Sequence, residues 1–266
     1  MKNKYEIADF EFDYEMPIAC TAIHNGHLLS DIIAANMALS EKERLYEEDP
    51  YTGYFTEICS NMIKVNYSRF QVDLNRPLSG SFYAVPQQAW GLQVRKELPE
   101  SAEIEFSNQC YRWYYQTVKE HIDMLLEKYA KIFVYDLHSY NHQRGGEGAD
   151  YDDPLQNPEI IIGTNNMPEV WFSLVDKIVE QLRSKDYFGR GLDVRVNVKF
   201  DGGHFSRWLH NTYGERVCCI ALEFKKIFMD EWTGEIDWIK AKRLREILQS
   251  SLAVIEKGLI CENAKK

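Results

Sequence analysis

The sequence predicts a single α/β domain with a central mixed, mostly parallel sheet flanked by helices. Apolar runs of strand length alternate with longer segments whose apolar residues recur at three- and four-residue steps, a pattern typical of α/β folds. The chain has 266 residues, 45% of them hydrophobic, and can therefore bury a large core. No Pro/Gly/Ser-rich linker or internal repeat interrupts the chain, so we expect residues 1–266 to form one domain.

Five regions have the apolar composition and the polar boundaries of buried strands. In chain order they are 18–23, 62–65 with 72–74, 132–137, 194–198 and 218–224. The run at 132–137 is expected to be a central strand, and the polar residues that follow it would then lie at the carboxyl end of the sheet. Open α/β sheets bind their ligands at that edge.

Five longer segments have the periodicity of amphipathic helices. In chain order they are 28–39, 107–128, 168–184, 205–213 and 238–257. Ser107 suits the N-cap of the second helix, because its hydroxyl can accept a hydrogen bond from a free backbone N–H. Pro168 suits the first turn of the third helix, because its missing N–H would have no partner there.

Residues 141–158 are rich in Gly, Asp and Asn and are expected to form a loop. The loop directly follows the strand at 132–137, so it could cover a ligand site at the carboxyl end of the sheet. An ordinary surface excursion would have the same composition.

The charge of the chain limits the kind of partner that it can bind. The net charge is −10 and the pI is about 5.3, which argues against nucleic acid or an anionic membrane as a general partner. A small anionic ligand in a local basic pocket remains compatible with this charge. The first residues lack the apolar core of a signal peptide and no run is long enough to span a membrane, so we expect a cytoplasmic protein.

The six cysteines form no Cys-x-x-Cys pair and mostly have apolar neighbours in the sequence. We interpret them as buried, reduced thiols.

Two histidines follow apolar runs and could be metal ligands. His138 follows the strand at 132–137, and Asp136 could orient its ring. His24 follows the strand at 18–23. A catalytic zinc site needs three protein ligands and one open position, and the third ligand could be His27 or an acid in the Glu-Glu-Asp run at 47–49. Histidines that only form hydrogen bonds at strand ends would have the same sequence pattern.

A short basic segment could bind an anion in this acidic protein. Arg69, Asn75 and Arg76 lie close together, with Asp73 between them. Guanidinium groups bind carboxylates in a bidentate manner and stabilise oxyanions, so two arginines suit an acidic substrate whose carbonyl group is attacked. Surface salt bridges are the alternative interpretation.

Two further positions have side chains that suit catalysis or binding. Glu223 lies at the end of the apolar run at 218–224, where a carboxylate beside a metal-bound water could act as a general base; it could also be an exposed strand end or a helix cap. The run at 201–207 begins a helix with two glycines, and His204 and Arg207 there could add donors for an anion.

Together these motifs resemble those of the N-formylglutamate amidohydrolase family, within the wider group of zinc hydrolases that includes aspartoacylase, succinylglutamate desuccinylase and the zinc carboxypeptidases. The resemblance extends from about residue 24 to residue 234. It is carried by the motifs YSRFQVDLNRP (67–77), DLHS (136–139), GGHFSR (202–207), ALEF (221–224) and FMDE (228–231). It implies a carboxypeptidase-like fold and a bound zinc ion.

The resemblance also implies a role for each matched residue. His24 and His138 would bind the metal, Glu223 would be the catalytic glutamate, and Arg69 would polarise the scissile carbonyl. Asn75 and Arg76 would receive the substrate carboxylate, with His204 or Arg207 as candidates for a second carboxylate. The wider group has a glutamate three residues after its first histidine, where this chain has His27. The third ligand would then be Asp49, or Glu48 as the alternative.

The expected function is zinc-dependent hydrolysis of N-formyl-L-glutamate to formate and L-glutamate, as in histidine catabolism. An alternative is a deacylase or carboxypeptidase-like enzyme that acts on another N-acyl amino acid or on a peptide. A second alternative is a non-catalytic anion-binding domain of the same fold.

Overall fold

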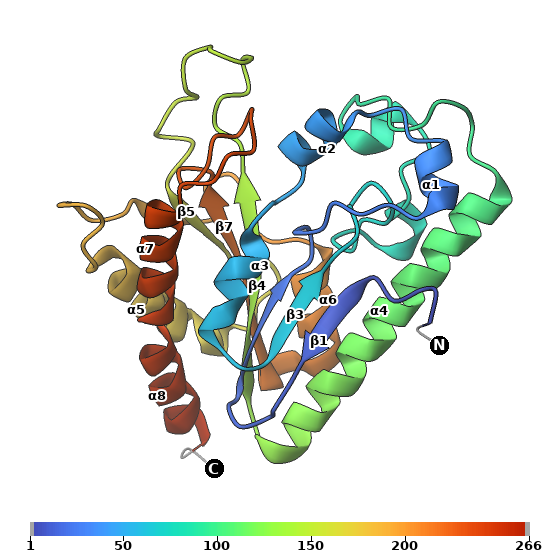
Figure 1. Ribbon diagram of the computed structural model, residues 1–266. Coiled ribbons are helices and arrows are strands. Elements are labelled where there is room, and N and C mark those ends of the chain that lie inside the picture. Colours follow the sequence, from blue (N-terminus) through green and yellow to red (C-terminus); the bar gives the residue numbers. More distant parts are fainter. Residues whose placement is uncertain (1–2, 264–266) are drawn as a thin grey trace.

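The computed structural model describes residues 3–263, and the side chains up to residue 260. Within this range the strands form one seven-stranded sheet in the order β1-β3-β2-β4-β7-β5-β6 (Figure 1). The strands are β1 (Ala8–Glu11), β2 (Ile18–Ala22), β3 (Met62–Val65), β4 (Ile132–Tyr140), β5 (Ile160–Gly163), β6 (Val194–Val196) and β7 (Val217–Lys225). The pairs β3–β2, β2–β4, β4–β7 and β5–β6 are parallel, whereas β1–β3 and β5–β7 are antiparallel. The predicted mixed, mostly parallel α/β sheet is confirmed.

Helices cover both faces of the sheet, with α4 on one side and α5, α7 and α8 on the other (Figure 1). The α-helices are α1 (Asp31–Ala35), α2 (Glu41–Glu47), α3 (Thr52–Phe55), α4 (Ser101–Lys128), α5 (Phe172–Arg183), α6 (His204–Tyr213), α7 (Trp238–Gln249) and α8 (Leu252–Asn263). Short 3-10 helices occupy Thr56–Ile58, Leu78–Gly80, Pro86–Ala89, Glu169–Trp171 and Gly214–Arg216.

Alternating side chains of the central strand β4 enter two separate cores, as the pleat of a strand requires. Phe133 and Tyr135 pack with residues of α5, α7 and α8, whereas Val134 packs with α4 and with Phe205 of α6. Every residue of β4 is buried. The central strands therefore provide a rigid support for side chains at their carboxyl ends.

A third, smaller apolar cluster lies beside these strand ends. It joins Ile33 of α1 to Phe70, Tyr83 and Val94. This cluster supports the chain around Arg69, which was predicted to bind an anion.

Two predicted elements near the site are wrong. Residues 72–74 are not a strand, because the backbone N–H of Asp73 bonds to the carbonyl of Ser81 (2.7 Å) and its side chain accepts from the backbone of Asn75 (2.8 Å), which makes a turn. Residues 28–39 are not one helix, because Leu28 continues beside Tyr67 as an isolated parallel bridge and only α1 is helical.

Other elements were predicted with different limits. Ser107 is not an N-cap: α4 begins six residues earlier, where the side chain of Glu103 accepts from the backbone of Glu100 (2.9 Å). β6 ends at Val196, because the next residue, Asn197, has a left-handed backbone (φ 54°). Strands β1 and β5, helices α2 and α3 and the break between α7 and α8 were not predicted. At this break, Ser251 donates its hydroxyl to the carbonyl of Leu248 (2.6 Å).

The predicted loop at 141–158 is confirmed and extends beyond the carboxyl end of β4 (Figure 1). Within the described chain, no helix has both the length and the apolarity that crossing a membrane requires. Cys20, Cys59, Cys110, Cys218 and Cys219 are buried free thiols, as predicted, and the side chain of Cys261 lies outside the described range.

Candidate metal centre

The carboxyl ends of β2, β4 and β7 bring polar side chains to one place. His24 lies two residues beyond β2, and His138 of β4 is paired across the sheet with Glu223 of β7. Asp49, which lies just beyond α2, is held there by a backbone hydrogen bond to the carbonyl of His24 (3.0 Å). Three neighbouring strands and one connecting segment therefore build the site.

His24, Asp49 and His138 form a compact and buried group. The Oδ2 atom of Asp49 lies 3.0 Å from Nδ1 of His138 and 3.4 Å from Nδ1 of His24. One ligand atom from each residue lies within 4.8 Å of the other two. Two imidazole nitrogens and one carboxylate oxygen are a donor set that suits catalytic zinc, which keeps a fourth position open. The residues present therefore fit a divalent metal ion.

Each histidine directs its other ring nitrogen at a second carboxylate. His24 Nε2 lies 2.8 Å from Oδ1 of Asp73, and His138 Nε2 lies 3.0 Å from Oδ2 of Asp136. The first contact is a hydrogen bond, whereas the second is an ion-pair contact without hydrogen-bond geometry. Metal-binding histidines generally have such a partner, which orients the ring. The Nδ1 atoms are therefore the ones available to a metal.

The electrostatic environment of the group favours a bound cation. Burial raises the pKa of Asp49, but hydrogen bonds and charge attraction from His138 and His24 outweigh it and hold the pKa well below its usual range. Burial lowers the pKa of His138, but Asp136 and Asp49 outweigh it and raise the pKa well above the usual value. Several carboxylates are thus buried close together, where unpaired negative charge is costly. Positive charge at this place, on a histidine or on a metal ion, is therefore favoured.

Asp73 connects the histidines to the predicted anion-binding segment. Its carboxylate is completely buried and accepts hydrogen bonds from His24, from Nη2 of Arg69 (2.8 Å), from the hydroxyl of Tyr83 and from the backbone of Asn75. Burial raises its pKa, but the charge of Arg69 and then that of His24 outweigh burial and hold the pKa well below its usual value. Asp73 is therefore an ionised partner for one candidate ligand and for Arg69.

Glu223 is half-buried beside the three candidate ligands. Burial raises its pKa to about 8, and Asp49 and Asp136 add to this effect while His138 and Arg69 oppose it. Within the described residues its carboxylate forms no hydrogen bond or ion pair. A carboxylate with a pKa near neutrality is suited to accept and return a proton.

A cavity of about 550 Å³ opens over this group, which is the size of a small-molecule site. Its lining includes all three candidate ligands together with Glu223, Arg69, Asn75, Arg76, Trp90, Arg144 and Lys199. The guanidinium of Arg69 lies 5.0 Å from the centre of the Trp90 ring, and its Nε atom is buried with no partner. Its Nη1 atom forms no hydrogen bond or ion pair within the described residues, so Arg69 has a donor available to a ligand in the cavity.

The family model for N-formylglutamate amidohydrolase matches residues 16–229 of this chain, which include every residue of the centre. The chain belongs to the N-formylglutamate amidohydrolase family.

Similar proteins cover nearly the whole chain. Two relatives named N-formylglutamate deformylase, from Pseudomonas putida and Pseudomonas aeruginosa, are 24% and 25% identical, over 90% of this chain and 93% of each relative. The crystal structure of N-formylglutamate amidohydrolase from Ralstonia eutropha has a TM-score of 0.73 at 18% identity, over 93% of this chain and 95% of that one. A gene product of Agrobacterium tumefaciens has a TM-score of 0.64 at 17% identity, over 94% and 96%. Both structures share the fold.

His27 and Glu48, the alternative candidates for the third metal ligand, lie in a separate hydrogen-bond network. His27 Nδ1 contacts Oε2 of Glu48 (2.5 Å), and Oε1 of Glu48 accepts a hydrogen bond from Ser68. Arg44 Nη1 donates to the carbonyl of His27 (2.7 Å). Both oxygens of Glu48 are therefore occupied away from the three candidate ligands. Of the two acids considered for the third ligand, the structure brings Asp49 to the histidines.

Two of the four predicted substrate-binding residues line the cavity of this amidohydrolase, and two do not. Asn75 and Arg76 lie on its wall. His204 instead contacts the hydroxyl of Tyr111 (3.1 Å), and Arg207 donates to the carbonyl of Gly202 (3.3 Å). The glycine before α6 explains the arrangement: a Cβ at Gly203 would lie 1.9 Å from Oδ1 of Asn75, so the helix packs directly against that side chain.

The sequence reasoning missed a buried lysine beside the site. Lys226 donates to the carbonyl oxygens of Tyr46 and Glu48 (both 2.9 Å) and so fixes the segment that carries Asp49. Burial lowers the pKa of Lys226 to about 8. Its position directly after β7, close to Glu223, is the only signal that the sequence offers. The sequence also offered a signal for Asp73, because this residue lies between Arg69 and Asn75 in the predicted anion-binding segment.

Proposed function

We propose that this protein is a metal-dependent amidohydrolase that converts N-formyl-L-glutamate and water into formate and L-glutamate, with one zinc ion per chain. The observation that carries the proposal is the buried His24, Asp49 and His138 group with Glu223 beside it. The relatives named N-formylglutamate deformylase support the choice of substrate.

The chemistry divides between the metal and the residues of the chain. A bound divalent ion acidifies water and polarises a carbonyl group. In this proposal Glu223 accepts the proton of the attacking water and delivers it to the departing amine, and its raised pKa supports both transfers. The water oxygen forms a bond to the formyl carbon, the C–N bond breaks, and formate and the amino group leave.

The basic segment positions the substrate and stabilises the developing charge. Nη1 of Arg69, which forms no hydrogen bond or ion pair within the described residues, can donate to the carbonyl oxygen as negative charge forms on it. Asp73 and Trp90 hold the Arg69 side chain in place through the contacts described above. In this proposal Arg76 and Asn75 receive the α-carboxylate. Both line the cavity, and the guanidinium of Arg76 makes no hydrogen bond or ion pair within the described residues.

The proposal is tested by metal analysis combined with an assay for formate. We expect about one zinc per chain, release of formate from N-formyl-L-glutamate, loss of that release on chelation, and its recovery when zinc is restored. A protein that binds zinc but does not release formate would still be interpreted as a hydrolase, with another N-acyl substrate. A protein that neither binds metal nor releases formate, even with added zinc, would instead be a binding domain.

A further inference from the structure

Among the described residues, five cationic side chains line the cavity, and three of them are already bonded to protein groups. The five are Arg69, Arg76, Arg144, Lys199 and Lys226. Arg69 is bonded to Asp73, and Lys226 to two backbone carbonyls. Nη1 of Arg144 donates to both oxygens of Glu47, at 2.9 and 3.2 Å. Each of these three side chains is therefore already held by groups of the protein.

Arg76 and Lys199 differ from the other three. Among the described residues, Arg76 has no hydrogen-bond or ion-pair partner for its guanidinium. Lys199 Nζ donates to the neutral side-chain oxygen of Asn157 (2.6 Å) and forms no ion pair within the described chain. Arg76 and Lys199 are thus the two lining cations that are held neither by a carboxylate nor by a pair of backbone carbonyls, and an N-acyl acidic amino acid carries two carboxylates.

The two cations come from segments that are far apart in the chain and meet at the cavity. Lys199 lies just after β6, and Arg76 lies in the segment between β3 and α4, next to Asn75. The wall from Lys199 to Gly203 is continuous, and Gly203 abuts Asn75. Four extended residues span at most about 14 Å. Two long side chains reaching inward from such a wall can contact both ends of one small substrate.

We propose that Lys199 receives the side-chain carboxylate of the substrate and thereby selects N-acyl derivatives of acidic amino acids. This inference rests on the proposed function, in which Arg76 and Asn75 receive the α-carboxylate. It gives Lys199 the role that the sequence had suggested for His204 or Arg207, neither of which lines the cavity.

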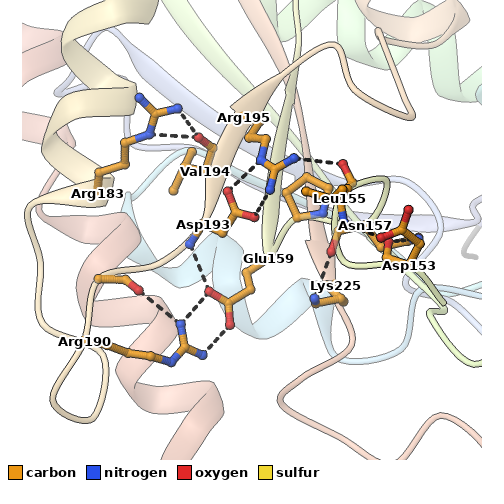
Figure 2. Close-up of polar contacts among 12 residues, drawn as sticks. Asp153, Leu155, Asn157, Glu159, Arg183, Arg190, Asp193, Val194, Arg195 and Lys225 are labelled. Carbon is orange, nitrogen blue, oxygen red and sulfur yellow. Dashed lines mark hydrogen bonds and ion pairs between the residues drawn. The ribbon is translucent and has the colours of Figure 1, made fainter. Parts of the chain in front are cut away.

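The surroundings of Lys199 hold its ammonium group in place before a substrate binds. Asn157, its partner, is fixed at the end of the 141–158 loop: its amide donates to the carbonyl of Asp153 (2.9 Å), and its own carbonyl accepts from Lys225 (2.8 Å). Arg195 donates to the carbonyl of Leu155 (2.8 Å). Figure 2 shows these bonds joining the loop to β6 and β7. The Lys199 ammonium also lies 5.0 Å from the centre of the Tyr140 ring. Such preorganisation reduces the entropy lost on binding.

The inference is tested by comparing an acidic substrate with its neutral isostere. We expect kcat/KM for N-formyl-L-glutamate to fall roughly 10- to 100-fold in K199M, the range for one lost charge-assisted hydrogen bond. We expect kcat/KM for N-formyl-L-glutamine to change little, which also shows that the variant is folded. K199R keeps the charge and should restore part of the preference for glutamate.

Lys225 provides a matched control, because it also binds Asn157 but does not line the cavity. K225M should keep the preference of the wild type for glutamate over glutamine. A K199M protein with the wild-type preference, or equal loss of preference in K225M, would overturn the role of Lys199 while leaving the hydrolase activity established.

Binding of the products by calorimetry makes the test independent of turnover. The wild type should bind L-glutamate more tightly than L-glutamine, and K199M should lose that difference. Equal affinity of the wild type for the two amino acids, or no binding of either, would overturn the inference. An inactive wild type with the expected binding difference would overturn the proposed reaction but not the role of Lys199.

Discussion

Glu159, just before β5, and Glu223 of β7 belong to the two partners of one antiparallel strand pair but have opposite electrostatic environments. Glu223 of β7 is opposite Ile161 of β5, and the backbone carbonyl of Glu159, just before β5, accepts from the N–H of Lys225 (3.0 Å). Burial raises the pKa of Glu159, but hydrogen bonds from Arg190 and from the backbone of Asp193 outweigh it and lower the pKa. Burial instead raises the pKa of Glu223 to about 8.

The difference lies in how many of the carboxylate oxygens have donors. Arg190 binds both oxygens of Glu159, and the backbone of Asp193 donates to one of them (2.9 Å), as Figure 2 shows. The carboxylate of Glu223 has no donor within the described residues and faces the cavity. A carboxylate with its donors in place stabilises the fold, whereas one without donors can bind a proton near neutral pH.

The largest expected effect comes from Glu223→Gln. We expect kcat to fall about 10²- to 10⁴-fold, because general acid–base catalysis is lost. Metal content should remain near that of the wild type and the melting temperature should not fall, because no hydrogen bond of the folded state is removed. Steady-state kinetics, elemental analysis and calorimetry measure these three quantities. Near-normal kcat in this variant would remove Glu223 from the mechanism.

The next effect concerns metal affinity, through Asp73→Asn. We expect zinc affinity to fall about 10- to 100-fold, because the variant weakens the hydrogen bond that orients His24. Competition with a chelator of known affinity measures the change without an activity assay. Unchanged affinity would show that Asp73 serves only Arg69 and Tyr83.

Glu159→Gln makes the same chemical change as Glu223→Gln at the fully bonded site. We expect the free energy of unfolding to fall by about 1 kcal/mol, because the amide has no negative charge and only one acceptor oxygen, so one of the hydrogen bonds from Arg190 is lost and the other is weakened. We expect kcat to remain close to that of the wild type. Urea unfolding and kinetics on the same preparation measure both. A large fall in kcat would show that this network also controls the site.

The smallest expected effect is the pH dependence of the stabilisation that Glu159 provides. The pKa of Glu159 is lower in the folded protein than its ordinary value of 4.5, so the unfolded state binds the proton more readily. The stabilisation by Glu159 is therefore complete above pH 4.5 and is lost as pH falls through the folded pKa. Urea unfolding between about pH 3 and 6 should show the wild type and Glu159→Gln converging at the acidic end. A difference in unfolding free energy between the two proteins that stays constant with pH would show that Glu159 does not titrate in this way.

The sequence indicated the central strands and the residues at their carboxyl ends because both signals are local. Uninterrupted apolar runs predicted β2, β4 and β7, and a polar residue directly after or late in each run indicated His24, His138 and Glu223. Edge strand β1 was missed because it has only four residues, alternately half-buried and exposed, and offers no continuous apolar run.

The tertiary structure decided which of the remaining polar residues reach the cavity. The sequence left His27, Glu48 and Asp49 as candidates for the third ligand, and for the second carboxylate it indicated His204 and Arg207 and not Lys199. Short-range sequence patterns do not predict which of these residues reach the cavity, because that depends on contacts between segments far apart in the chain. Ser68 and Arg44 hold Glu48 and His27 away from the candidate metal ligands.

The sequence by itself determined the fold class, the family resemblance and the types of side chain available for catalysis. The folded chain determined their arrangement: Lys226 fixes the segment that carries Asp49, Asp73 joins His24 to Arg69, and the close packing of Gly203 on Asn75 positions α6. The physical reason is that local periodicity selects strands and helices, whereas partners for buried charges come from residues far apart in the chain.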